Sequence, residues 1–218
     1  MSDFDEQTRT LTAKVVYYGP ALSGKTTNLL ALHDRLQGRT AGELLVLDTK
    51  NDRTLFFDLL PLRFRAEGGL TVRLKVFTVP GQVAHDATRK AVLSRADAVA
   101  FVADSQLSQS TNNFESFRNL EENAGRVGLA FDRLPLVVQY NKRDLPDVVP
   151  EAEVRQRWGA AGVPVVFSSA LRGAGVAETF QELLRGLHGA LEAEMGLASR
   201  WGVPAASFVA GVFSGAAP

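Results

Sequence analysis

Eight residues near the amino terminus have the types and spacing of a phosphate-binding loop. Gly19-Pro20-Ala21-Leu22-Ser23-Gly24-Lys25-Thr26 directly follows the apolar run 15–18 and precedes a segment of helical period. Such a loop turns its backbone N–H groups toward a phosphate, while the lysine neutralises phosphate oxygens and the hydroxyl after it ligates Mg²⁺. The sequence therefore predicts a site for a nucleotide with Mg²⁺. The residues expected at the phosphates are Gly19, Ala21, Leu22, Ser23, Gly24, Lys25, Thr26 and Thr27.

A second motif, Asn141-Lys142-Arg143-Asp144, follows the apolar run 135–141 and predicts which base is bound. A carboxylate can accept hydrogen bonds from both N1–H and the 2-amino group of guanine, and adenine has no such pair of donors. We expect Asp144 to make this contact, Asn141 to bond N7 and tie its loop to the phosphate loop, and Lys142 to lie along the base. Residues expected to offer a backbone N–H to the guanine carbonyl are Ser169, Ala170 and Leu171.

The third motif is Val79-Pro80-Gly81-Gln82, at the end of another predicted strand. Gly81 can donate its N–H to a γ-phosphate, and Gln82 can orient an attacking water. These roles predict hydrolysis of GTP to GDP and phosphate. A GTP-gated binding module with negligible hydrolysis stays open as an alternative, whereas the guanine motif disfavours an ATPase or kinase.

Apolar runs of strand length alternate with longer segments of helical period along the chain. This alternation predicts an α/β fold with a doubly wound, mostly parallel sheet, and Glu67-Gly68-Gly69 predicts one antiparallel edge pair. In such sheets, ligands bind beyond the carboxyl ends of the strands, where all three motifs fall. The expected strands are 13–18, 44–48, 62–66, 71–79, 98–104, 135–141 and 164–168, and the expected helices are 24–37, 85–95, 112–123, 150–158 and 176–191.

The composition excludes several classes of protein. The 218 residues have no net formal charge and no cysteine. There is thus no basic field to hold nucleic acid or an anionic bilayer, and disulfides, thiolate zinc sites and cysteine lipidation are excluded. The acidic first residues lack the apolar region of a secretory signal, so we expect a cytoplasmic protein without nucleic-acid partners or direct membrane insertion.

With these motifs the chain resembles the Ras-like small GTPases over residues 12–192. The strings at 17–20, 49–58, 78–82 and 139–146 look like the bacterial gliding-motility and polarity GTPases of the MglA type. This resemblance implies a nucleotide-dependent switch that marks a cell pole or drives motility, through an effector that the sequence does not name. It also implies a homodimeric roadblock-fold regulator that accelerates hydrolysis or nucleotide exchange.

Two departures from the general Ras pattern concern Mg²⁺ and the γ-phosphate. Ras-like proteins usually have aspartate three residues before the switch glycine, and this chain has Thr78. We therefore expect Mg²⁺ to be held by Thr26 and Thr54, since this ion needs few protein ligands besides phosphates. The second departure is Ala21, where Ras proteins commonly have glycine; its methyl group narrows the space for a group from a partner.

In the MglA-type GTPases that the chain resembles, the arginine beside the switch threonine acts as an internal arginine finger. Arg53 has the matching position before Thr54. The resemblance therefore implies that Arg53 stabilises the charge that develops during hydrolysis. The alternative is an ordinary charge in a solvated loop.

We divide the chain into an extension at 1–11, a GTP-binding domain at 12–196 and an apolar tail at 197–218. The apolar part of the tail is far shorter than the roughly 20 residues that span a bilayer. The tail either docks on its own domain or is offered to a partner. Because the motifs end before Leu197, truncation there is expected to leave GDP affinity within about threefold.

Overall fold

A central β-sheet runs through the structure, a computed structural model that describes residues 2–48, 56–66, 68–82 and 85–214. The strand order is β3-β4-β5-β2-β6-β7-β8, with β1 paired to β2. The strands are β1 (Asp3–Asp5), β2 (Thr10–Tyr18), β3 (Leu45–Asp48), β4 (Phe56–Arg65), β5 (Thr71–Thr78), β6 (Ala98–Asp104), β7 (Leu136–Asn141) and β8 (Val165–Phe167). The helices are α1 (Lys25–Leu36), α2 (Asp86–Leu93), α3 (Ser110–Arg126), α4 (Glu151–Gly159), α5 (Val176–Met195) and α6 (Ala205–Ser214), with short 3-10 turns η2 (Leu107–Gln109), η3 (Phe131–Arg133) and η4 (Ala170–Arg172).

The central strands pair in parallel, and helices connect them. β2 lies between β5 and β6, and β7 and β8 continue the parallel part of the sheet. β4 pairs antiparallel with β5, as Glu67-Gly68-Gly69 predicted, and β3–β4 and β1–β2 are further antiparallel pairs. The predicted α/β fold with a doubly wound, mostly parallel sheet is confirmed.

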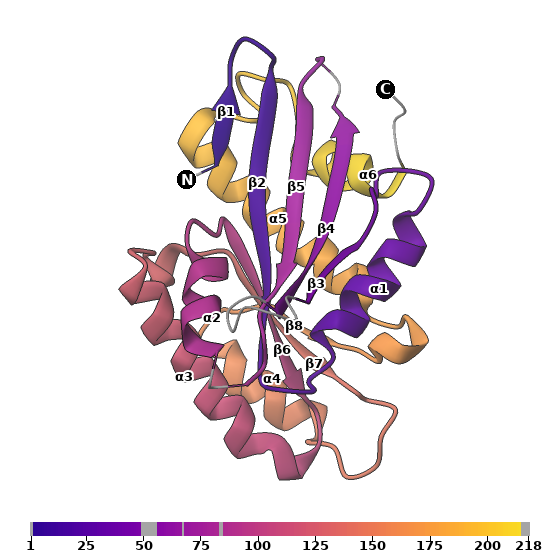
Figure 1. The fold of residues 1–218 in the computed structure, drawn as a ribbon, viewed down its shortest axis with the longest axis vertical. Coiled ribbons are helices and arrows are strands. Elements are labelled where there is room, and N and C mark those ends of the chain that lie inside the picture. Colours follow the sequence, from indigo (N-terminus) through magenta and orange to yellow (C-terminus); the bar gives the residue numbers. More distant parts are fainter. Residues whose placement is uncertain (1, 49–55, 67, 83–84, 215–218) are drawn as a thin grey trace.

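Alternate residues of β2 enter two different cores because successive strand side chains point to opposite faces. Val15 and Tyr17 belong to the core beneath α1, α5 and α6. Val16 and Tyr18 belong to the core beneath α2, α3 and α4. Figure 1 shows these two helical layers on either side of the sheet. All seven residues of β6 are buried, as both faces of a central strand require.

Most predicted elements match the structure to within a few residues, and β4 differs most. The sequence predicted a strand at 62–66, and the structure has Phe56–Arg65. Pro61 lies inside this strand, although proline is normally excluded from the interior of a central strand because it lacks the N–H needed for pairing. It is accommodated because it faces the short connection after α1: the N–H of Gly42 donates to the Pro61 carbonyl over 2.8 Å.

The apolar residues after α5 are part of the core. Leu197 and Val203 are buried, and so are Phe208 and Val212 of α6. Phe208 packs on Phe64 of β4, with 5.8 Å between the ring centroids. Of the two arrangements that the sequence left open, the described part of the tail, residues 197–214, is docked on its own domain. The division of the chain at residues 11 and 196 stays a prediction.

Within the part of the chain that the structure describes, no helix has both the length and the apolar character needed to cross a bilayer.

Candidate nucleotide-binding site

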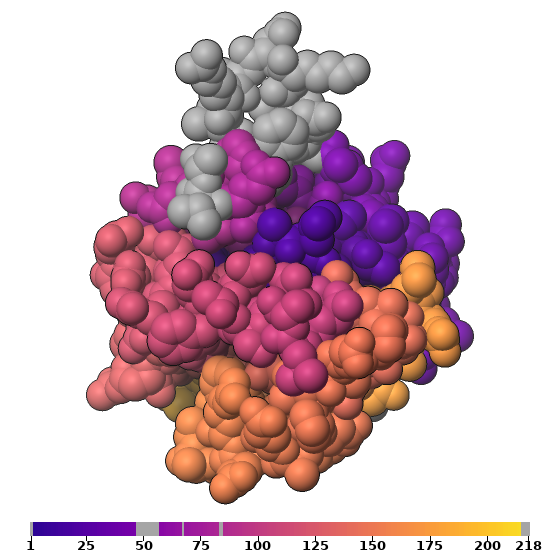
Figure 2. Space-filling view, turned by 90° about the horizontal axis from the view of Figure 1, so that it is seen from below, coloured from indigo at the N-terminus to yellow at the C-terminus, as the bar shows by residue number. Residues whose placement is uncertain are grey.

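The three motifs meet at the carboxyl ends of the parallel strands. The phosphate loop follows β2, the switch segment 79–82 follows β5, and the base-selecting loop follows β7. Figure 2 looks onto this end of the molecule, where the indigo-to-purple surface of the first quarter of the chain borders pink and orange surface from later segments. The topology of the sheet thus brings together motifs that are far apart in the sequence.

The phosphate loop has the backbone conformation that its glycines permit. Gly19 has φ 150° and Gly24 has φ 97°, and Leu22 also has a positive φ of 61°. A side chain at position 19 would collide with the carbonyl of Val102, and one at position 24 would collide with the amide of Asn141. Both glycines are therefore required by close approach as well as by φ.

Lys25 is the buried cation of this site. Its side chain is only 7 % exposed, and Nζ donates to the carbonyls of Gly19 (3.0 Å) and Pro20 (2.7 Å). Burial lowers the pKa of Lys25 to about 7, and the positive charge of Arg89 contributes to this shift. Two buried cations close to one loop favour an anionic ligand, because an added negative charge offsets the loss of hydration.

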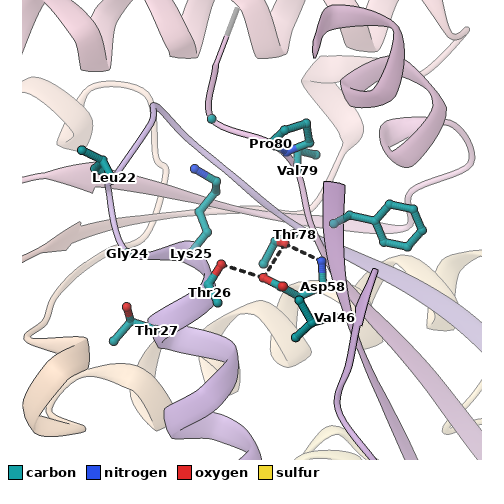
Figure 3. A pocket seen from close by; sticks show the side chains of 12 residues that line it. Leu22, Gly24, Lys25, Thr26, Thr27, Val46, Asp58, Thr78, Val79 and Pro80 are labelled. Carbon is teal, nitrogen blue, oxygen red and sulfur yellow. Dashed lines mark hydrogen bonds between the residues drawn. The ribbon is translucent and has the colours of Figure 1, made fainter. Parts of the chain in front are cut away.

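A pocket of about 440 Å³ lies beside the start of α1, between the phosphate loop, the first residues of β4 and the carboxyl end of β5. Figure 3 shows Thr26, Asp58 and Thr78 joined by hydrogen bonds along its wall. Thr26 Oγ1 donates to Asp58 Oδ2 over 2.7 Å, and Thr78 Oγ1 donates to the same oxygen over 2.9 Å. The Asp58 N–H in turn donates to Thr78 Oγ1 over 2.9 Å, so Thr78 fixes this carboxylate.

Asp58 is the residue that the sequence reasoning missed. It lies within the string 49–58 that carries the resemblance, and Thr78 in place of aspartate predicts the loss of an anion near Mg²⁺. The Asp58 carboxylate accepts a hydrogen bond from the Thr78 hydroxyl. A carboxylate from β4 therefore lies beside the position at which β5 has threonine in place of aspartate. The sequence does contain a signal for Asp58. In a strand, Asp58 shares one face with the buried Leu60, Leu62 and Phe64, and a buried carboxylate on an apolar strand face is rare.

The oxygen atoms of this wall fit a hard cation. Mg²⁺ prefers oxygen ligands and typically takes one or two from the protein, with phosphate and water oxygens completing its shell. The Thr26 hydroxyl and the Asp58 carboxylate are such donors, directly beside Lys25. Thr54, the second predicted magnesium ligand, lies outside the described residues, as does Arg53.

Asn141 joins the phosphate loop to the base-selecting loop. Its Nδ2 donates to the Ser23 carbonyl over 2.9 Å, while its Oδ1 accepts from the Ala170 N–H over 2.8 Å. The Ser168 hydroxyl also donates to Oδ1, over 3.1 Å. One buried side chain therefore holds three loops in register. The Ala170 N–H is engaged by Asn141 in this structure, and the predicted contact of the 169–171 turn with a guanine carbonyl stays a prediction.

The other two residues of the base motif are also held in place. Lys142 has a positive φ of 67°, and its Nζ pairs with the Asp104 carboxylate over 2.6 Å. The Ser169 hydroxyl donates to Asp144 Oδ1 over 2.6 Å. This hydrogen bond is the main cause of a lowered pKa for the Asp144 carboxyl. Asp144 is thus kept ionised and can act only as an acceptor, as guanine recognition requires.

Gln82 is not brought to the phosphate-loop pocket. Its side chain is exposed and lines a neighbouring groove between the phosphate loop and α3. Gly81 does line the pocket, and it lies so close to Ala21 that any side chain at position 81 would collide with the Ala21 backbone. The structure therefore assembles the phosphate and base motifs, with Gln82 on the far side of Gly81.

The fold and this site define a small GTPase domain. No protein-family model matches the chain. It is 42 % identical over 185 residues to the mutual gliding-motility protein MglA of Myxococcus xanthus (strain DK1622), a match that covers 85 % of this chain and 95 % of that protein. The chain belongs to the MglA-type family of small GTPases.

Proposed function

We propose that this chain binds GTP and GDP with Mg²⁺ and hydrolyses GTP to GDP and phosphate as a molecular switch. The single observation that carries the proposal is the Asn141 link, which holds a phosphate loop and a guanine-selecting loop as one site. Lys25 and the amides of residues 19–27 would bind the phosphates. Asp144 would select guanine, with Lys142 along the base.

Hydrolysis would need positioning and charge compensation more than covalent chemistry. Gln82 would orient the attacking water, Gly81 would contact the γ-phosphate, and Arg53 would stabilise the developing charge. Thr26 and Thr54 would hold Mg²⁺, with Asp58 supporting Thr26. When bound, Mg²⁺ neutralises charge on the phosphate oxygens.

We further propose that the switch serves gliding motility or cell polarity, with recruitment to a cell pole. The support is the similarity to a protein that is named for gliding motility. A homodimeric roadblock-fold protein would be the regulator, and the effector is unassigned.

A GTP-gated binding module with negligible turnover is the second candidate. The exposed position of Gln82, outside the phosphate-loop pocket, favours it. Single-turnover GTP hydrolysis, measured with and without a purified roadblock-type regulator, separates the two functions. Hydrolysis that the regulator accelerates supports the switch enzyme, while tight GTP binding without turnover in either condition supports the module.

The base assignment predicts a change of nucleotide preference. Asp144→Asn replaces an acceptor with a donor opposite the 2-position, so GDP should bind about five- to a hundredfold more weakly, which is about 1–3 kcal/mol. Xanthosine diphosphate, with a carbonyl there, should bind better. Titration of both nucleotides measures the effect, with Asp132→Asn on an exposed turn as the control. Unchanged GDP affinity would remove Asp144 from the base site.

The Thr26–Asp58 contact predicts a role for Asp58 in holding Mg²⁺. Asp58→Ala removes the carboxylate that orients Thr26, and loss of such a supporting group typically weakens metal affinity about 10- to 100-fold. We expect a higher Mg²⁺ concentration to be needed to slow the release of a fluorescent GDP analogue. Asp132→Ala, at a side chain that is 80 % exposed, is the control. An unchanged Mg²⁺ dependence would leave Asp58 with a purely structural role.

A further inference from the structure

Arg89 of α2 is an arginine in an unusual environment. Its side chain is only 2 % exposed, and it is the largest fully buried side chain among the described residues. No carboxylate of the described residues forms an ion pair with it. Burial of an unpaired cation is costly unless hydrogen bonds replace its hydration. The hydrogen-bond partners of the Arg89 guanidinium therefore indicate the role of this residue.

Those partners are the backbone of the switch segment and one side chain of α3. Nε donates to the Pro80 carbonyl over 3.0 Å, and Nη2 donates to the Gly81 carbonyl. Nη1 donates to Asn119 Oδ1 over 2.8 Å. The guanidinium carbon lies 5.7 Å from the centre of the Tyr18 ring. One planar fork thus connects two consecutive carbonyls before Gln82 to α3.

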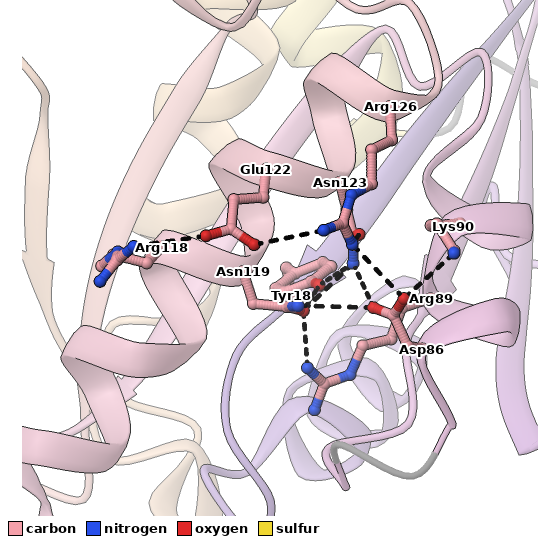
Figure 4. Close-up of polar contacts among 9 residues, drawn as sticks. All are labelled: Tyr18, Asp86, Arg89, Lys90, Arg118, Asn119, Glu122, Asn123 and Arg126. Atoms are coloured by element: carbon pink, nitrogen blue, oxygen red, sulfur yellow. Dashed lines mark hydrogen bonds and ion pairs between the residues drawn. The ribbon is translucent and has the colours of Figure 1, made fainter.

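A polar network holds Asn119 in turn, as Figure 4 shows. Tyr18 donates its hydroxyl to Asn119 Oδ1 over 2.5 Å. Asn123 donates to the same oxygen over 3.1 Å and to Asp86 Oδ1 over 2.8 Å. The Asn123 hydrogen bond is the largest cause of the lowered pKa of Asp86. The anchor point on α3 is therefore itself fixed, so Arg89 holds the switch segment against a rigid surface.

Gly81 is confined from two sides. Its α-carbon faces the Ala21 backbone without room for a side chain, and its carbonyl is held by Arg89. Gln82 follows at once, and its side chain lines the groove of about 580 Å³ whose walls include Ala21, Arg89 and Asn119. The direction of the Gly81 N–H and the starting point of the Gln82 side chain are consequently set by the 80–81 backbone.

We propose that Arg89 is a positioning residue for GTP hydrolysis: it holds the Pro80 and Gly81 carbonyls to α3 and thereby sets where the Gly81 N–H and the Gln82 side chain lie. A buried ion serves stability poorly, since an apolar side chain of similar size is often as stabilising. A guanidinium can bind two carbonyls at once, which no apolar residue can do. This inference rests on the proposed function.

Arg89→Lys tests the proposal because it keeps the charge and removes the fork. A small displacement of a catalytic group costs up to about 100-fold in rate. We expect single-turnover hydrolysis to fall about 10- to 100-fold, with GDP affinity changed by less than about threefold. Arg133→Lys makes the same substitution in η3, away from this groove, at a side chain that is 87 % exposed, and it should leave both values unchanged.

A double-mutant cycle with Gln82→Ala separates positioning from general destabilisation. If Arg89 acts through Gln82, then Arg89→Lys should slow hydrolysis by less than about threefold once Gln82 is absent. Equal losses in both backgrounds together with an unchanged ratio of GTPγS to GDP affinity, or an unchanged rate in Arg89→Lys alone, would overturn the proposal. Should Arg89→Lys fail to fold, Asn119→Ala removes the anchor of Arg89 on α3 but keeps the guanidinium fork to the Pro80 and Gly81 carbonyls, and the same non-additivity with Gln82→Ala is expected.

The unsubstituted chain distinguishes failure of this proposal from failure of the proposed function. If it binds GTP without hydrolysing it even with a regulator, the hydrolytic function fails, and the ratio of GTPγS to GDP affinity becomes the measurement. Only the nucleotide with a γ-phosphate meets the Gly81 N–H, so Arg89→Lys should change this ratio by more than about threefold. An unchanged ratio overturns the positioning role, and a chain that binds no guanine nucleotide overturns both proposals.

Discussion

Arg53→Ala is expected to reduce regulator-stimulated GTP hydrolysis by about 10³- to 10⁵-fold while leaving GTP affinity nearly intact. An arginine finger acts on the charge of the transition state, so its loss raises the barrier by about 4–7 kcal/mol and barely changes ground-state binding. Arg53 lies outside the described residues, and this expectation follows from its position beside Thr54 and from the family to which the chain belongs.

Single-turnover hydrolysis with saturating regulator measures the effect, and GTP affinity is measured in parallel. Arg63→Ala is a suitable control, since Arg63 is an exposed arginine on β4 away from the pocket. If the regulator only reshapes the switch loop, it should need no arginine of its own. Turnover that survives Arg53→Ala, yet vanishes when one arginine of the regulator is removed, would assign the finger to the partner.

The elements that the sequence predicted well are those whose pattern is fixed by burial on both faces. Residues 98–103 are an uninterrupted apolar run between polar segments, and β6 occupies Ala98–Asp104. The antiparallel side was harder to predict. Pro61 breaks the strand pattern of β4, and only the neighbouring connection, which pairs with its carbonyl, explains why the strand continues through it. Local sequence carries no information on that pairing.

The residues of the site divide in the same way, into those that a contiguous motif reveals and those that only long-range contacts reveal. The phosphate loop and the base motif are contiguous strings whose chemistry can be deduced from residue types. Asp58 and Arg89 act through partners on other elements, namely Thr26 across the pocket and the 80–81 carbonyls. An arginine at a buried helix position has no sequence signature, because it looks like any polar residue on an amphipathic helix until its partners are known.

The tail also depends on tertiary contacts. Its small, uncharged residues give little helical periodicity, so the sequence left its conformation open. In the structure, the Thr40 hydroxyl donates to the Val212 carbonyl over 2.7 Å, and Arg39 donates to the Phe213 carbonyl over 2.9 Å. Both donors belong to the connection between α1 and β3. The carboxyl end of α6 thus has its carbonyls satisfied by a distant segment, which no helix-ending signal in the tail itself would reveal.

This packing argues against the expectation that truncation at Leu197 leaves GDP affinity within about threefold. Phe208 is fully buried between Phe64 and His188, with ring centroids 5.8 and 5.7 Å away. Phe208→Ala should lower the free energy of unfolding by about 3–5 kcal/mol, because it removes buried area and leaves a cavity that the surrounding elements cannot fill. A domain of this kind has only about 5–15 kcal/mol in total.

Removal of residues 197–218 deletes Leu197, Val203 and all of α6, so its cost should exceed that of Phe208→Ala and abolish GDP binding together with the fold. Urea unfolding of the nucleotide-free chain measures the stability, and Phe114→Ala, at a side chain that is 64 % exposed, is the matched control. The unfolding midpoint should fall for Phe208→Ala at an unchanged slope. The contrary result is a truncated chain whose free energy of unfolding lies within about 1 kcal/mol of that of the full chain and which binds GDP normally. In that case α6 would be dispensable, and the burial of its side chains would contribute little to the stability of the domain.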